Sequence, residues 1–290
     1  MAAARGYALL IPLSIIWGGA FVAIREADFE LSSVNLTLLR WFIVCAAFLV
    51  LYPFIVKPRT RLELRDLPRF LVVGAFNVAV YHLSLNYSEK TVDASFAGLL
   101  ISLAPLFGVL LSAVFLREKV GRRVFLALAL GLAGTFVIFV PDLNLGVASL
   151  LGPLAVVLSS FASGAYTVAS KPLVTKYGPI PVAVWASLLG TALLLPLATP
   201  DLAQQAASLS FYGWASVLYL ALLSTVLANT IYFMLVGLQP VSRLSVQLYL
   251  VPLVSVTGGI VLLGESLSAF TVAGGLVLLL AVTLVTLRRR

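Results

Sequence analysis

Charged residues are scarce in this chain: Asp, Glu, Lys and Arg make up 10% of its 290 residues, while 61% are hydrophobic. A soluble domain carries about a quarter charged residues, and no core of this size could bury so much apolar surface. The composition therefore excludes an ordinary soluble fold and predicts that most of the apolar surface faces lipid. The net charge of +8 then belongs to loops at a membrane surface, and we expect no nucleic-acid partner.

Residues that bind metals or form disulfides are almost absent. The single cysteine, Cys45, excludes an internal disulfide, and one cysteine with one histidine, His82, cannot build a Cys/His metal site. The sequence has no GxxxxGK[ST] phosphate loop and no HExxH motif. We therefore expect no metal, no cofactor, no built-in ATP motor and no enzymatic activity.

Long apolar runs fill the chain instead. A bilayer-spanning helix takes about 20 mostly apolar residues, and a helix satisfies its own backbone hydrogen bonds in lipid. The sequence therefore predicts an all-α integral membrane protein with ten transmembrane helices. The predicted spans are 6–24, 34–56, 68–87, 93–116, 122–140, 148–170, 180–199, 212–237, 243–263 and 268–287.

One segment of the chain occurs twice. Residues 103–120, LAPLFGVLLSAVFLREKV, return at 250–267 as LVPLVSVTGGIVLLGESL, offset by 147 positions without a gap. We therefore predict two related halves, residues 1–144 with spans one to five and residues 145–290 with spans six to ten.

Basic residues predict how the halves are oriented. If all ten segments cross the membrane, 16 of the 19 Lys and Arg residues lie on the side of the N-terminus. The positive-inside rule then places both termini in the cytoplasm. Because each half has five spans, the second half enters the membrane upside down. Inverted repeats of this kind are typical of transporters, with a substrate site near the midplane between the halves.

These features resemble the EamA-type branch of the drug/metabolite transporter (DMT) superfamily, including its YddG-like amino-acid exporters. The resemblance rests on Trp17-Gly18, Leu39-Arg40, Pro105 followed by Leu116-Arg117-Glu118, and Pro252 followed by Leu263-Gly264-Glu265. It implies a multi-pass transporter of the bacterial inner (plasma) membrane that works by alternating access. The second half departs from the pattern, with Gly164 in place of a second tryptophan and no counterpart of Arg40.

The expected function is export of small metabolites, most of all neutral or aromatic amino acids, without ATP. No Asp or Glu lies at the middle of a predicted span, which predicts passive transport or exchange rather than ion coupling. Transport of nucleotide sugars, purines or other metabolites, a channel-like pore, and a membrane scaffold stay open as alternatives. The expected partners are a small-molecule substrate and the lipid bilayer, with the chain a monomer or a homodimer.

Polar and aromatic side chains within the spans are candidates for substrate binding. Such groups are costly in lipid and usually face a cavity, although membrane helices also use them as packing seams. The candidates, which include the position pair 102 and 249 related by the repeat, are Trp17, Asn77, Tyr81, His82, Ser102, Ser163, Tyr166, Asn229, Tyr232 and Tyr249. For His82, a proton relay and a structural role stay open.

Five further residues are assigned to movement or anchoring. Pro105 and Pro252 each remove one backbone hydrogen bond, so they are hinges or static kinks. Glu118 and Glu265 end spans four and nine, and we expect each to cap or pair at the start of the next helix as an anchor of its repeat.

Arg40, the fifth, is the only charged residue well inside a predicted span. We assign it to structure or gating. Three other interpretations stand: binding of a substrate carboxylate, pairing with an acidic residue at positions 26, 28 or 30, and snorkelling outward.

Overall fold

The computed structural model describes residues 2–55, 62–119, 121–139, 147–238, 241 and 250–286, and the regular secondary structure of these residues is entirely helical. The first half contains α1 (Ala2–Asp28), α2 (Ser33–Ile55), η1 (Leu64–Asp66), α3 (Leu67–Gly74), η2 (Ala75–Val80), α4 (Tyr81–Glu89), α5 (Ala94–Leu100), η3 (Ile101–Leu103), α6 (Ala104–Phe115) and α7 (Arg122–Phe139). The second half contains α8 (Val147–Tyr177), α9 (Pro179–Leu194), η5 (Leu195–Leu197), α10 (Leu202–Ser208), α11 (Phe211–Leu218), η6 (Tyr219–Leu227), α12 (Ala228–Leu238), α14 (Leu250–Leu263) and α15 (Ala269–Thr286).

Six helical rods among these residues are long and apolar enough to cross a membrane: Ser33–Phe54, Leu64–Glu89, Ala94–Phe115, Leu150–Tyr177, Pro179–Leu197 and Phe211–Leu238. Two shorter apolar helices cover Val254–Leu263 and Ala269–Ala281. Helical residues fall within each of the ten predicted spans. The prediction of an all-helical membrane protein is confirmed, while the count of ten spans stays a prediction.

Two of the rods combine α-helical and π-helical segments. The rod of α3, η2 and α4 is π-helical at Ala75–Val80, and the rod of α11, η6 and α12 is π-helical at Tyr219–Leu227. A π-helical turn inserts an extra residue into the helix and occurs often at functional sites. Both π-helical segments lie in the middle of their rods, at the depth where a central site is expected.

The order of helices recurs at the 147-residue offset of the sequence repeat. α7 at Arg122–Phe139 corresponds in both bounds to α15 at Ala269–Thr286. Arg117 and its counterpart Gly264 both adopt the left-handed backbone conformation, with φ of 55° and 69°. Helix packing recurs as well, because α6 packs on α8 and its counterpart α14 packs on α1.

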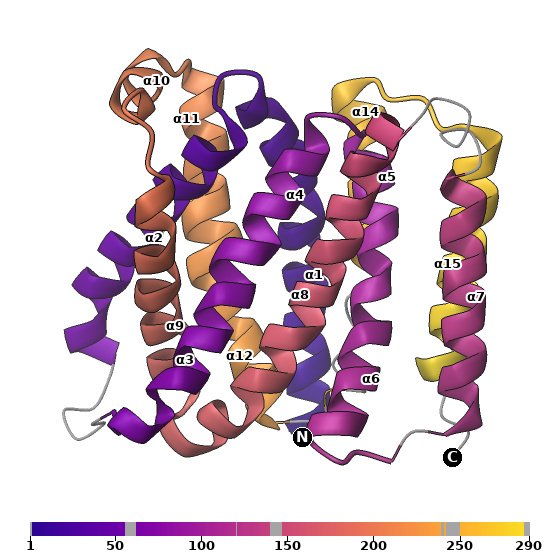
Figure 1. The fold of residues 1–290 in the computed structure, drawn as a ribbon, viewed down its shortest axis with the longest axis horizontal. Coiled ribbons are helices and arrows are strands. Elements are labelled where there is room, and N and C mark those ends of the chain that lie inside the picture. Colours follow the sequence, from indigo (N-terminus) through magenta and orange to yellow (C-terminus); the bar gives the residue numbers. More distant parts are fainter. Residues whose placement is uncertain are drawn as a thin grey trace.

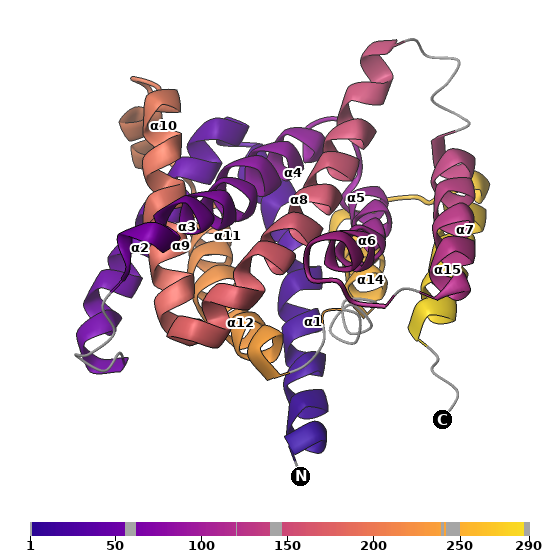
Figure 2. The same ribbon diagram turned by 60° about the horizontal axis from the view of Figure 1, so that its bottom comes forward.

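The figures show where these helices lie. α7 and α15 pack against each other and form a pair at one edge of the bundle (Figures 1 and 2). α1 begins and α15 ends at the same end of the bundle, whereas α6 and its counterpart α14 end at opposite ends (Figure 1). The outer surface is apolar, and Phe54, Phe115 and Val261 are each more than two-thirds exposed, as expected of side chains that face lipid.

The proline and glutamate predictions have different outcomes. Pro105 occupies the first turn of α6, directly after the 3₁₀ segment η3 and inside the continuous rod Ala94–Phe115, where it lacks the N–H of a helical hydrogen bond, so its role as a hinge or a kink stays a prediction. Glu265 does not cap the next helix, α15, so that prediction is wrong. Its carboxylate accepts hydrogen bonds from the backbone N–H groups of Ala94 and Ser95 at 2.8 and 3.0 Å, at the start of α5 in the other half.

Glu265 binds the start of α5 and not that of α15 because the first turns of these two helices differ. The first turn of α15 is already capped by Ser268, which accepts a hydrogen bond from the Thr271 N–H at 3.0 Å. The N-cap residue of α5, Asp93, makes no side-chain capping bond, so the N–H groups of that helix are open to another acceptor. Glu118 accepts a hydrogen bond from Ser112, in the helix it follows, at 3.3 Å.

Candidate substrate cavity

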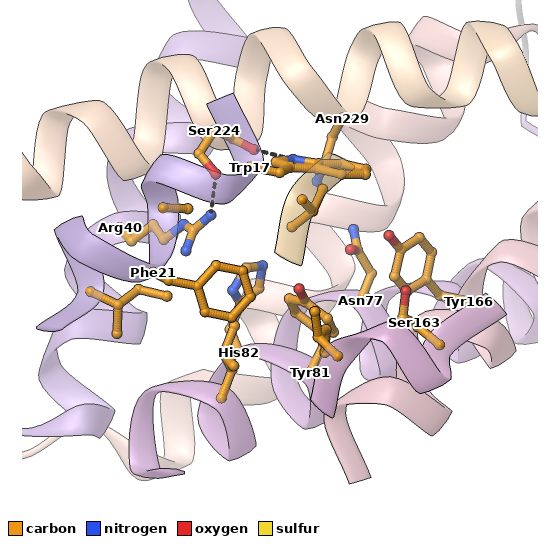
Figure 3. A pocket seen from close by; sticks show the side chains of 16 residues that line it. Trp17, Phe21, Arg40, Asn77, Tyr81, His82, Ser163, Tyr166, Ser224 and Asn229 are labelled. Atoms are coloured by element: carbon orange, nitrogen blue, oxygen red, sulfur yellow. Dashed lines mark hydrogen bonds between the residues drawn. The ribbon is translucent and has the colours of Figure 1, made fainter. Parts of the chain in front are cut away.

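A cavity of about 60 Å³ lies at the centre of the bundle, enclosed by helices of both halves (Figure 3). The wall is formed by Trp17, Ala20, Phe21, Ile24, Arg40, Asn77, Tyr81, His82, Leu85, Ile101, Ala104, Ser163, Tyr166, Ser224, Asn229 and Val251.

Aromatic rings make up one part of this wall. Trp17 on α1 lies with its ring centroid 5.0 Å from that of Tyr232, and its indole N–H donates to the Ser224 carbonyl at 3.0 Å (Figure 3). Tyr166 on α8 lies 6.2 Å from Tyr232 and 6.4 Å from Tyr81, ring centroid to ring centroid. Such edge-to-face contacts fix the rings, so the cavity has a preformed apolar surface.

Neutral polar side chains make up the second part. Asn77 on η2, Ser163 on α8 and Asn229 on α12 approach from three elements, and each is less than a tenth exposed. His82 on α4 packs edge-on against Trp41 and Tyr81, with ring centroids 5.2 and 4.8 Å apart. Its Nδ1 has no hydrogen-bond partner among the described residues. These groups offer donors and acceptors to a polar ligand without adding charge.

Arg40 is the one charged residue among those that form the described wall. Its Nε donates to the Thr225 hydroxyl at 2.9 Å and its Nη2 donates to the Ser224 hydroxyl at 3.4 Å. The side chain is buried, so it does not snorkel outward, and it forms no ion pair within the described part of the chain. The interpretation that it pairs with an acidic residue at positions 26, 28 or 30 is therefore wrong.

The acidic residues near Arg40 in sequence have other contacts. The Asp28 carboxylate lies 3.7 Å from the Lys90 ammonium. The Glu30 carboxylate accepts hydrogen bonds from the backbone N–H and the hydroxyl of Ser210 at 2.6 and 2.5 Å. Since these donors bind the ionised form, they hold the pKa of Glu30 below its ordinary value.

Several wall positions correspond between the halves. At the 147-residue offset, Asn77 corresponds to Ser224, His82 to Asn229, and Ala104 to Val251. Arg40 has no such counterpart in the wall, because Ser187 is buried within α9 and donates to the Ala183 carbonyl at 2.7 Å. The two halves therefore share some matched wall positions, while the charge of the described wall comes from the first half alone.

The structure brings most of the candidate binding residues together. Trp17, Asn77, Tyr81, His82, Ser163, Tyr166 and Asn229 all line the cavity. Ser102 does not, because its hydroxyl donates to the Leu99 carbonyl at 2.5 Å within its own helix. Tyr232 lies behind Trp17, with its hydroxyl 2.9 Å from that of Thr167. Tyr249 lies outside the described residues. Pro105 and Pro252 adjoin wall residues Ala104 and Val251 without forming the wall.

Three residues near the cavity were missed from the sequence. Phe21 and Ser224 are part of the wall. Ser224 could have been predicted from the sequence, because it is the counterpart of Asn77 at the 147-residue offset. Glu89, at the end of α4, is completely buried, and neither of its carboxyl oxygens has a hydrogen-bond partner among the described residues. It lies two helical turns beyond His82 on the same face. The predicted span ended at position 87, which put Glu89 in a loop.

The second tryptophan of the family pattern is absent for a steric reason. A Cβ atom on Gly164 would lie 2.7 Å from the backbone nitrogen of Gly108, so the close packing of α8 on α6 leaves no room for a side chain. This departure from the repeat therefore belongs to helix packing.

Comparison with known proteins agrees with this architecture. The model of the EamA-like transporter family matches residues 4–140 and again 150–287. An uncharacterised transporter of Archaeoglobus fulgidus is 33% identical over 94% of this chain and 95% of its own length. A probable terminal-alkyne amino-acid exporter of Streptantibioticus cattleyicolor is 32% identical over 96% of this chain and 92% of its own.

More distant comparisons agree as well. A probable amino-acid metabolite efflux pump of Salmonella typhimurium is 25% identical, covering 93% of this chain and 91% of its own. A solved crystal structure superposes with a TM-score of 0.70 over 98% of both chains at 20% identity, which shows a common fold.

Proposed function

Because the chain belongs to the EamA-like transporter family, we propose that it exports small metabolites, in the first place neutral or aromatic amino acids. The observation that carries this proposal is the central cavity. Its wall combines aromatic rings, neutral polar groups and a single cation, and no carboxylate is part of the described wall. The relatives named as an amino-acid exporter and an amino-acid metabolite efflux pump support the same substrate class.

The proposed architecture is ten transmembrane helices in two inverted repeats, residues 1–144 and 145–290. One pair of contacts supports the inversion. The Glu63 N–H donates to the Tyr177 hydroxyl at 3.3 Å, and the Ser210 N–H donates to the Glu30 carboxylate at 2.6 Å. At the 147-residue offset, Glu63 corresponds to Ser210 and Tyr177 corresponds to Glu30. The donor therefore lies in the first half in one contact and in the second half in the other. A two-fold relation between the halves produces such a swap.

The opposite ends reached by α6 and α14, and the common end shared by the start of α1 and the end of α15, support the same architecture (Figure 1). The bias of basic residues supports a cytoplasmic location of both termini. We propose the bacterial inner membrane as the location, with the substrate crossing from the cytoplasm outward.

The proposed mechanism is alternating access without ATP. In alternating access, a cavity between the two halves opens towards one side of the membrane and then towards the other. The two π-helical segments contribute Asn77 and Ser224 to the wall, and Pro105 and Pro252 adjoin it. We assign the movement to these four matched elements, because π-helical turns and proline positions leave backbone bonds that can rearrange at low cost.

Nucleotide sugars fit this cavity less well. Their two phosphate groups need several cationic partners, and Arg40 is the one cation that the described wall provides.

Counterflow in proteoliposomes tests the proposed function. Vesicles loaded with unlabelled L-phenylalanine should accumulate external labelled L-phenylalanine, with no ATP present. Asn229→Leu removes a cavity amide at similar volume, and we expect counterflow to become roughly 5- to 150-fold slower, since one unmade buried hydrogen bond costs about 1–3 kcal/mol. Gln204→Leu on exposed α10 is the matched control and should leave the rate unchanged. Absence of counterflow with phenylalanine, leucine and alanine would refute the amino-acid assignment.

A further inference from the structure

Hydrogen bonds hold the Arg40 guanidinium in place, but not all of its nitrogens have a hydrogen-bond acceptor among the described residues. Thr225 and Ser224 accept hydrogen bonds from Nε and Nη2, and both belong to η6 of the second half. Nη1 is buried and has no hydrogen-bond partner among the described residues. Because two nitrogens are anchored, the planar group is fixed and its remaining N–H donors have a defined direction.

A buried cation needs a counter-charge, and within the described residues Arg40 has none in contact. Removing an ion from water costs several kcal/mol unless an opposite charge and hydrogen bonds compensate. Glu89 is buried as well, but it forms no ion pair with Arg40. Asp28 is occupied by Lys90 instead. Among the described residues, the Arg40 guanidinium therefore has no counter-ion in contact with it.

The surroundings of Arg40 show what kind of anion would fit. The rest of the described wall is neutral, and it places the rings of Trp17, Phe21 and Tyr166 in the same small space (Figure 3). One cation suits a single carboxylate, whereas a phosphate ester would leave charge uncompensated. An apolar or aromatic substituent next to that carboxylate would pack on the rings.

We propose that Arg40 is the carboxylate subsite of the cavity, with Nη1 as the donor to a monocarboxylate whose apolar side chain packs against the aromatic wall. This inference rests on the proposed transport function and replaces the gating role assigned from the sequence. The corresponding position in the second half is Ser187, outside the wall. The substrate carboxylate therefore meets the same helices, α2 and η6, whichever side the cavity opens towards.

Ligand-dependent thermal stabilisation of the purified protein tests the subsite with defined probes. The probes are L-phenylalanine, 3-phenylpropionate, which keeps the carboxylate without the amine, and L-phenylalaninamide, which keeps the amine without the carboxylate. We expect the two carboxylates to stabilise the native protein and the amide to be at least tenfold weaker. Arg40→Gln should weaken both carboxylates by roughly ten- to a hundredfold, the range for hydrogen bonds to a charged group, without changing the response to the amide.

Two further variants separate recognition from folding. Arg40→Lys keeps the charge but loses the planar fork, so it should restore part of the carboxylate response. Arg69→Gln changes an exposed arginine of α3 and should leave all three responses unchanged. The ratio between carboxylate and amide responses is the decisive readout, because a structural role of Arg40 would lower all responses together.

The outcomes distinguish the subsite from the transport function. Stabilisation by 3-phenylpropionate but not by L-phenylalanine, lost in Arg40→Gln, sustains the carboxylate subsite while the amino-acid function fails. Equal loss of carboxylate and amide responses in Arg40→Gln overturns the subsite. It is also overturned if neither carboxylate stabilises the native protein, or if both stabilise Arg40→Gln as well as they stabilise the native protein.

Discussion

The contact between Glu265 and the start of α5 holds the second half against the first, and its removal should loosen that helix. The carboxylate accepts hydrogen bonds from the N–H groups of Ala94 and Ser95 and, at 2.5 Å, from the Ser95 hydroxyl. Gly259 leaves the space that this carboxylate occupies, because a Cβ atom there would overlap it. Glu265→Ala leaves both N–H groups without an acceptor and removes a negative charge from a helix N-terminus.

The magnitude follows from these contacts. An unpaired donor in a partly buried site costs about 1–3 kcal/mol, and a charge at a helix N-terminus contributes about 0.3–1 kcal/mol. We therefore expect local opening of α5 to become about 3 kcal/mol easier, which corresponds to amide hydrogen exchange on the order of 100-fold faster at Ala94 and Ser95. Glu265→Gln keeps one acceptor oxygen and should show an intermediate effect.

Hydrogen exchange measured by mass spectrometry reads this change helix by helix, so the protein need not unfold reversibly. Glu26→Ala is the matched control and should leave α5 unaffected, because the Glu26 side chain makes no hydrogen bond or ion pair within the described part of the chain. Exchange in α5 within about twofold of native in Glu265→Ala would refute the reasoning, because the N–H groups would then have another acceptor.

Two further predictions concern packing and pH. Gly190→Ala would put a Cβ atom 2.6 Å from the Gly74 carbonyl oxygen. We therefore expect the free energy of unfolding to fall by about 1–3 kcal/mol and the melting temperature to fall with it. Gly121→Ala, which has open space around it, is the control and should melt like the native protein. Ser210→Ala removes the main hydrogen bond that lowers the pKa of Glu30. The native protein is therefore more stable than the variant at neutral pH, and this difference shrinks as the pH falls through the lowered pKa of Glu30. At still lower pH, the melting temperatures of the two proteins should differ only by a pH-independent amount, which comes from the lost cap of α11. A constant difference at every pH would contradict this.

The positions of the helices follow closely from the sequence, because hydropathy and length decide where a chain can cross lipid. The predicted segment 122–140 matches α7 at Arg122–Phe139, and 268–287 matches α15 at Ala269–Thr286. The ends were less predictable. α8 continues seven residues beyond the predicted end at 170, to Tyr177, because Lys176 and Tyr177 bind Asp66 at 2.6 and 2.5 Å and so stabilise a polar last turn that hydropathy assigns to a loop.

The candidate site was predictable to the extent that helical spacing and side-chain type determine it. Seven of the ten candidate residues line the cavity, because polar groups on a membrane helix have few other places to lie. Ser102 deviates because a hydroxyl can bond to a carbonyl of its own helix and then needs no cavity. Helical spacing in the sequence does not distinguish a serine that lines the cavity from one that bonds to its own helix.

The sequence by itself determined the membrane location, the helical content and the repeated segment, since composition, run length and a 147-residue repeat are properties of the chain alone. The tertiary structure decided the contacts between segments distant along the chain. It placed Glu265 on α5 across the two halves, and it left Nη1 of Arg40 without a hydrogen-bond partner among the described residues. The reason is that a span buries its side chains against helices far away in sequence, so the partner of a charged group is fixed by packing.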